Sequence, residues 1–127
     1  MDNSFSYYPG FAEIDLEKIV NNIKSAKKLI GDKPLILGVV KANAYGHGLL
    51  PSALAMLKGG ATYLGTAQIS EALKLRYELN KINSQAESNI LHPNILSWLY
   101  APNAPFAKAI ENDIELSVGS FWAMEKI

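Results

Sequence analysis

The stretch VVKANAYGHG, residues 39–48, decides how the whole sequence is interpreted. Two valines end a short apolar run, Lys41 follows them, and small residues then surround one tyrosine and one histidine. A short continuous apolar run is typical of a parallel strand that is buried on both faces. In parallel α/β folds, ligands bind at the carboxyl ends of the strands. Lys41 stands at that end. The stretch therefore predicts an α/β fold with an amine at the end of the sheet where ligands bind.

A lysine in this position can form a covalent bond with a carbonyl compound. Removal from water disfavours the charged form of the amine, and a neutral amine attacks a carbonyl carbon to give a Schiff base. Tyr45 carries a hydroxyl that can hydrogen-bond an anionic group such as a phosphate. The neighbouring residues are small enough for a ligand to approach the backbone: Ala42, Ala44, Gly46 and Gly48. Spacing alone leaves open the alternative that Lys41 only reaches into solvent.

The amino-acid composition excludes several kinds of partner and chemistry. The 127 residues make one ordinary domain, and their 12 basic and 12 acidic side chains cancel, so we expect no nucleic-acid partner and no membrane partner. The absence of cysteine excludes disulfides and thiolate chemistry, and the two histidines stand too far apart in sequence to predict a metal site. Neither a secretory signal nor an apolar stretch of about 20 residues is visible, which favours a cytoplasmic location.

The pattern along the chain predicts alternating strands and helices. Residues 15–31 form an amphipathic helix between a capping aspartate and a glycine. After it we expect strands at 34–42, 62–67, 95–102 and 114–120, and helices at 49–60, 68–80, 104–113 and 121–127. We expect the polar segment 80–94 to be a surface loop. Such alternation fits either an open doubly wound sheet or a closed eight-stranded barrel, and no G-x-G-x-x-G fingerprint follows the first strand.

Residues 39–48 closely resemble the lysine motif of the alanine racemases, which depend on pyridoxal 5'-phosphate. The resemblance continues in AEIDLEKIVNNI (12–23), which is similar to the opening segment of that family, and in LGTAQISEALKLR (64–76), which is similar to its second conserved block. ILSWLYAP (95–102) and IELSVGS (114–120) occupy the places of its third and fourth strands. A long motif with further blocks at suitable spacing is a specific signal.

The resemblance implies an α/β fold that is part of a TIM-type (β/α)8 barrel, about its first four β/α units. Residues 1–127 would be the N-terminal half of the pyridoxal-phosphate-binding barrel domain, and the β-rich C-terminal domain of the family would be absent from this chain. The family works as a head-to-tail homodimer. We expect the isolated chain to be marginally stable or prone to aggregation, because part of a barrel has open edges and an uncovered interior face.

The function implied by the resemblance is the interconversion of L-alanine and D-alanine, which supplies D-alanine for peptidoglycan. Lys41 would hold the cofactor through a Schiff base and exchange a proton at the substrate Cα on one face. Tyr45 would hydrogen-bond the cofactor phosphate, and Val39 and Trp98 would neighbour the cofactor ring. The opposite-face base and the arginines for the pyridine nitrogen and the substrate carboxylate lie beyond Ile127 in the family, so we expect this chain alone to be inactive.

Two other functions stay open. One is a related barrel racemase with a different or broader amino-acid substrate, and the other is a non-catalytic barrel protein that binds pyridoxal phosphate. The remaining polar residues are interpreted as structural. Glu71 and Arg76 are expected to be loosely paired surface groups, worth about 0–1 kcal/mol, and not site residues. The loop 80–94 is expected to lie on the amino-terminal side of the barrel, where an insertion is functionally neutral.

Overall fold

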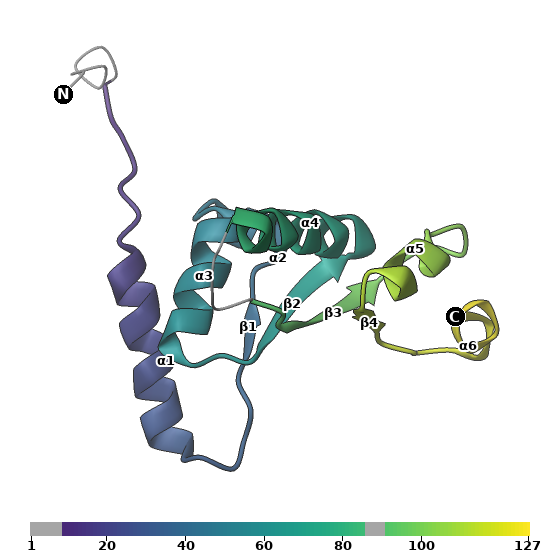
Figure 1. Cartoon of the computed structure of the whole chain (residues 1–127), viewed down its shortest axis with the longest axis horizontal. Helices are drawn as coiled ribbons and strands as arrows, with labels where there is room; N and C mark the ends of the chain where they lie inside the picture. Colours follow the sequence, from purple (N-terminus) through teal and green to yellow (C-terminus); the bar gives the residue numbers. More distant parts are fainter. Residues whose placement is uncertain (1–8, 86–90) are drawn as a thin grey trace.

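The computed structural model describes residues 9–85 and 91–127 (Figure 1). Its strands and helices alternate as predicted, except that a short helix at residues 41–45 follows the first strand, which the sequence predicts to extend to residue 42. The strands are β1 (Leu37–Val39), β2 (Tyr63–Gln68), β3 (Asn94–Leu99) and β4 (Ile114–Leu116). The helices are α1 (Leu16–Ile30), α2 (Lys41–Tyr45), α3 (Leu49–Gly59), α4 (Ile69–Gln85), α5 (Phe106–Glu111) and α6 (Phe121–Lys126). All strand pairs are parallel, and the order in the sheet is β1-β2-β3-β4.

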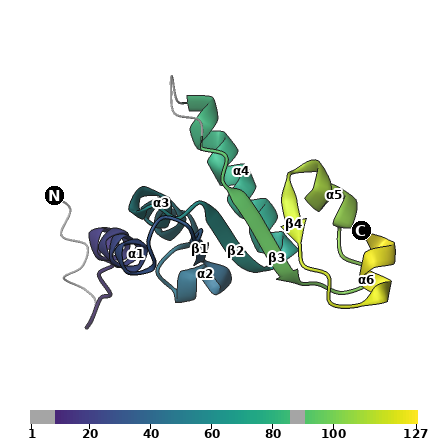
Figure 2. The same ribbon diagram turned by 90° about the horizontal axis from the view of Figure 1, so that it is seen from below.

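Within residues 9–85 and 91–127, helices cover one face of this sheet and leave the other open. On that face α3 and α4 pack against a hydrophobic core (Figures 1 and 2) that contains Val40, Leu64, Leu75, Leu79, Ile95 and Ile114. The opposite face carries the alternate residues of the strands, among them Val39, whose side chain is 42% exposed. The prediction from the apolar run that the first strand is buried on both faces is therefore wrong in this chain.

The sheet decides between the two architectures that the sequence pattern allows. In a doubly wound sheet the strand order reverses at a switch point and helices cover both faces. Here the strands follow each other in chain order, and the helices that pack on the sheet lie on one face. That arrangement is typical of a segment of a (β/α)8 barrel, as predicted.

The first helix lies beside α3 rather than on the sheet (Figure 1). Asp15 caps it as predicted, because its side chain accepts hydrogen bonds from the backbone amides of Glu17 and Lys18. The close approach of the two helices depends on Gly59, since a Cβ there would lie 2.8 Å from the carbonyl oxygen of Val20. This packing lets α1 border the cavity described below.

The predicted loop 80–94 is shorter than expected. Helix α4 continues to Gln85, and β3 begins at Asn94, so both ends of the predicted loop belong to regular elements. Leu79 and Ile82 continue the inward face of the helix at helical spacing, and this burial outweighs the polar composition. The Asn83 side chain bonds both the N–H and the C=O of Leu91, each at 2.8 Å. Residues 86–90 of the predicted loop lie outside the described residues.

Arg76 is a buried clamp at the amino ends of β3 and β4, not a surface group as predicted. Its side chain is only 1% exposed. Its Nη2 donates to the carbonyl oxygens of Pro93 (3.0 Å) and Asp113 (3.1 Å), and its Nε donates to that of Asn112 (3.0 Å). Burial lowers the pKa of Arg76, and the nearby Asp113 carboxylate opposes that effect. The clamp joins α4 to the segments that lead into both strands.

We predict that Arg76→Met strongly destabilises the chain. The substitution leaves three backbone carbonyls without their donor. The cost is about 1–3 kcal/mol for the buried bond to Pro93, and less for each of the partly buried bonds to Asn112 and Asp113. Urea unfolding followed by far-ultraviolet circular dichroism at low protein concentration measures the loss. The matched control is Lys74→Met on the exposed side of the same helix, which should shift stability by less than about 0.5 kcal/mol. Equal unfolding midpoints for the two variants would rule out the clamp.

The uncovered sheet face and the unpaired edges of β1 and β4, as seen within residues 9–85 and 91–127, also predict self-association of this chain. Analytical ultracentrifugation should find species heavier than the 13.9 kDa monomer, increasing with concentration. A monomer at every concentration, with a sharp and reversible melting transition, would show that the open face is tolerated in water.

Candidate functional site

Lys41 lies at the carboxyl end of β1, as the sequence predicts. The backbone amide of Val40 donates to the carbonyl oxygen of Gly65 at 2.8 Å, so the pairing with β2 continues up to the residue before Lys41. Val40 itself is fully buried. The Lys41 side chain is partly exposed, and its Nζ lies 5.5 Å from the centroid of the Tyr45 ring. The two residues with the clearest predicted roles therefore stand together.

The chain after Lys41 forms a left-handed turn. The φ angles are 52° at Ala42, 56° at Asn43, 52° at Ala44 and 50° at Tyr45. A left-handed conformation costs roughly 1–2 kcal/mol for each residue other than glycine, and it is normally confined to single residues. The sequence gives little sign of this turn, because alanine and tyrosine do not favour positive φ. Such strain persists only where the surrounding structure over-determines the backbone.

Local hydrogen bonds close the turn onto the start of α3. The carbonyl oxygen of Asn43 accepts from the amides of Gly46 (3.1 Å) and Gly48 (3.0 Å), and both glycines have the positive φ that this path requires. The side-chain oxygen of Asn43 accepts from the amide of Leu49 at 2.8 Å. The His47 ring lies with Nδ1 2.8 Å from the carbonyl oxygen of Ala44, so Nδ1 is the donor. His47 thus supports the turn.

Glu71 connects the turn to a distant part of the chain. Its Oε1 accepts from the amide of Ala42 at 2.6 Å, and its Oε2 accepts from the amide of Gln68 at 3.2 Å. The prediction that Glu71 is a loosely paired surface group is wrong. The pattern Gln68-x-x-Glu71 at the start of a helix is similar to a capping box, and this signal in the sequence points to the second of these bonds. Nothing in the sequence points to the first.

Val39 and Trp98 lie on the same uncovered face of the sheet. Val39 pairs with Gly65 and Gly65 with Leu96, and Trp98 follows two residues later on the same side of β3. A Cβ on Gly65 would lie 3.0 Å from Cζ3 of Trp98. The indole therefore reaches over the middle of β2 because position 65 has no side chain. Val39 lies on β1, on the other side of β2 from Trp98.

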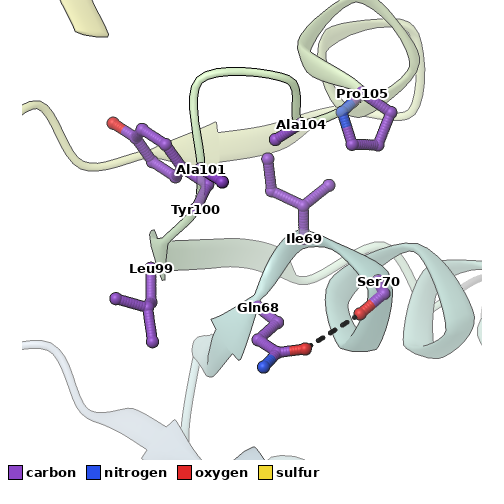
Figure 3. A pocket seen from close by; sticks show the side chains of 8 residues that line it. All are labelled: Gln68, Ile69, Ser70, Leu99, Tyr100, Ala101, Ala104 and Pro105. Carbon is purple, nitrogen blue, oxygen red and sulfur yellow. Dashed lines mark hydrogen bonds between the residues drawn. The ribbon is translucent and has the colours of Figure 1, made fainter.

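Two hollows lie at this end of the sheet. A cavity of about 250 Å³ lies between α1, the turn and α3, and its walls include Val39, Ala44, Tyr45, His47, Ser52 and Met56. A second hollow of about 480 Å³ lies at the carboxyl ends of β2 and β3 (Figure 3). Its walls are Gln68, Ile69, Ser70, Leu99, Tyr100, Ala101, Ala104 and Pro105. The sequence does not predict this second hollow, because residues at the ends of β2 and β3 and at the start of α4 meet there only in the fold.

The described part of the chain gives two further findings. It contains no group of three histidine, aspartate or glutamate side chains that could hold a metal ion. None of the helices within residues 9–85 and 91–127 is long and apolar enough to cross a lipid bilayer.

Comparison with known proteins identifies similar sequences from one family. Residues 14–127 match the family model for the N-terminal domain of alanine racemase. The alanine racemase of Beutenbergia cavernae is 41% identical over 120 residues, which cover 94% of this chain and 29% of that protein. The alanine racemase of Thermobifida fusca is 44% identical over 117 residues, which cover 91% of this chain and 28% of that protein.

A solved structure supports the same assignment. The alanine racemase from D-cycloserine producing Streptomyces lavendulae matches with a TM-score of 0.76 at 36% identity, over 89% of this chain and 26% of that chain. This similarity confirms the predicted barrel-type α/β fold. The chain spans less than a third of the length of these relatives. The chain belongs to the alanine racemase family, as an N-terminal portion of such a protein.

Proposed function

We propose that the complete gene product carrying this sequence is a pyridoxal-phosphate-dependent alanine racemase, an isomerase that interconverts L-alanine and D-alanine. The observation that carries the proposal is the amine of Lys41, at the carboxyl end of β1 and beside the Tyr45 ring. Family membership supports it, because the relatives named above are alanine racemases. Since this chain covers less than a third of those relatives, the racemase activity is proposed for the complete product.

The side chains around Lys41 fit pyridoxal phosphate. An aldehyde needs an amine, and a phosphate needs hydrogen-bond donors; Lys41 offers the first and the exposed hydroxyl of Tyr45 the second. We assign Val39 and Trp98 to the apolar surroundings of the cofactor ring, since both lie on the uncovered sheet face. When bound, the cofactor weakens the Cα–H bond of an amino acid by withdrawing electrons from it.

Racemisation needs a proton-transfer group on each face of the substrate carbon. We assign one of them to Nζ of Lys41, which would remove or return the proton at Cα. The other group, the arginines for the substrate carboxylate and pyridine nitrogen, and the C-terminal β domain belong in this proposal to the complete product, which would work as a homodimer. We further propose a cytoplasmic enzyme that supplies D-alanine for peptidoglycan.

We predict that Lys41→Ala abolishes covalent capture of the cofactor. In the complete product incubated with pyridoxal phosphate, borohydride reduction should fix a pyridoxyl group on the peptide that contains Lys41, identified by mass spectrometry. Lys41→Ala should lose this label, and alanine racemisation should fall by at least about 10³-fold. Lys74→Ala, which removes an exposed lysine of α4, is the control and should leave both unchanged. A label that persists without Lys41 would reject the assignment.

We also predict that Tyr45→Phe weakens cofactor binding without removing the covalent link. The change deletes only the hydroxyl, and a hydrogen bond to a charged group contributes about 1.5–3 kcal/mol, which is roughly 10-fold or more in affinity. Absorbance titration of the apoprotein with pyridoxal phosphate measures the affinity. Tyr77→Phe, at an exposed position of α4, should not change it. Equal affinities in all three proteins would exclude Tyr45 as a phosphate ligand.

A further inference from the structure

We propose that Glu71 positions Lys41 for its reaction by holding the peptide bond between Lys41 and Ala42. The inference rests on the proposed function and adds to it a positioning residue from another element of the fold. It begins with the hydrogen bond from the amide of Ala42 to Oε1 of Glu71, which is 2.6 Å long and joins residues 29 positions apart. Hydrogen bonds to a carboxylate are shorter and stronger than neutral ones.

This bond acts directly on the backbone that carries the lysine. The amide of Ala42 belongs to the peptide plane that follows the Cα of Lys41, so fixing that plane fixes one side of the residue. On the other side, the carbonyl oxygen of Val40 in the peptide before Lys41 accepts from the amide of Ala44 at 2.9 Å, and one residue earlier the amide of Val40 is held by the carbonyl oxygen of Gly65 at 2.8 Å. Lys41 is therefore flanked by two tethers to the β2–α4 segment, one from a backbone carbonyl and one from Glu71.

The carboxylate of Glu71 is itself held in place. Its Oε2 accepts from the amide of Gln68, the last residue of β2, at 3.2 Å. Glu71 stands in the first turn of α4, where the helix dipole favours a negative charge. The next residue, Ala72, is fully buried in the core, as is Leu75. The position of the carboxylate is therefore set by the packing of α4 against the sheet.

The turn needs the hydrogen bond to Glu71 because its other hydrogen bonds join residues that are close in the sequence. The bonds that close it onto α3 involve Asn43, Ala44, His47 and their neighbours. The amide of Ala44 also donates to the carbonyl oxygen of Val40 at 2.9 Å, which holds the peptide before Lys41, but the amide of Ala42 in the peptide after Lys41 is held by Glu71. Four consecutive residues with positive φ would relax if that peptide were free to rotate. Rotation there changes the direction of the Lys41 side chain, and a small misplacement of a reacting group lowers its rate strongly.

The experiment uses the complete gene product as apoprotein. Pyridoxal phosphate is added, samples are reduced with borohydride at successive times, and mass spectrometry follows the label on Lys41 and on the exposed Lys74 of the same molecule. Glu71→Ala and Glu71→Asp are compared with the unmodified protein. The aspartate keeps the charge but is shorter, so it cannot span both amides. The control is Glu78→Ala, further along α4, which changes the net charge equally. Circular dichroism checks that each variant is folded.

We expect both Glu71 variants to label Lys41 at least about 10-fold more slowly, with labelling of Lys74 unchanged and Glu78→Ala equal to the unmodified protein. We also expect kcat for alanine to fall while KM stays within about 3-fold, because a positioning role affects the reacting geometry more than substrate binding. If a folded Glu71→Ala or Glu71→Asp variant labels Lys41 at the unmodified rate, the inference is overturned and the proposed function stands. If the unmodified protein does not label Lys41, both are overturned.

Discussion

The left-handed turn after Lys41 is the constraint on which the candidate site depends. Residues 42–45 keep positive φ angles that their side chains do not favour. The turn persists because its backbone groups are bonded on several sides: Val40 and Asn43 contribute within the segment, and Glu71 contributes from α4. The result is that the Lys41 amine stands beside the Tyr45 ring at the carboxyl end of the sheet. Strained segments of this kind cluster at functional sites.

The amino end of the sheet contributes to stability, and the carboxyl end holds the candidate site. At the amino ends of β3 and β4, Arg76 bonds three backbone carbonyls and joins α4 to the incoming segments. At the carboxyl ends lie Lys41, Tyr45 and Glu71, together with two hollows. Barrel enzymes separate stability from chemistry in this way. Because α4 supplies both Arg76 and Glu71, packing of this one helix supports the fold at one end and the candidate site at the other.

Local sequence patterns predict the elements well and the contacts between them poorly. The alternation of strands and helices follows from apolar periodicity, and Asp15 follows from capping chemistry. The face that carries Trp98 depends on the pairing with Gly65 and Leu96, which no single strand reveals. The bond from Ala42 to Glu71 and those from Arg76 join residues 17 to 37 positions apart through backbone groups, and the sequence does not indicate which backbone groups will meet. The length of α4 is misjudged because Ile82, three residues after Leu79, continues the inward face of the helix beyond its predicted end despite the polar composition.

Residue-resolved amide hydrogen exchange at Ala42 tests most directly whether Glu71 holds the backbone beside Lys41. The neighbouring amide of Asn43 is an internal reference, since the two amides bonded by Glu71 are those of Ala42 and Gln68. Our account predicts that in the folded apoprotein Ala42 exchanges at least about 10-fold more slowly than Asn43, after correction for intrinsic rates. Equal protection of the two amides would contradict it.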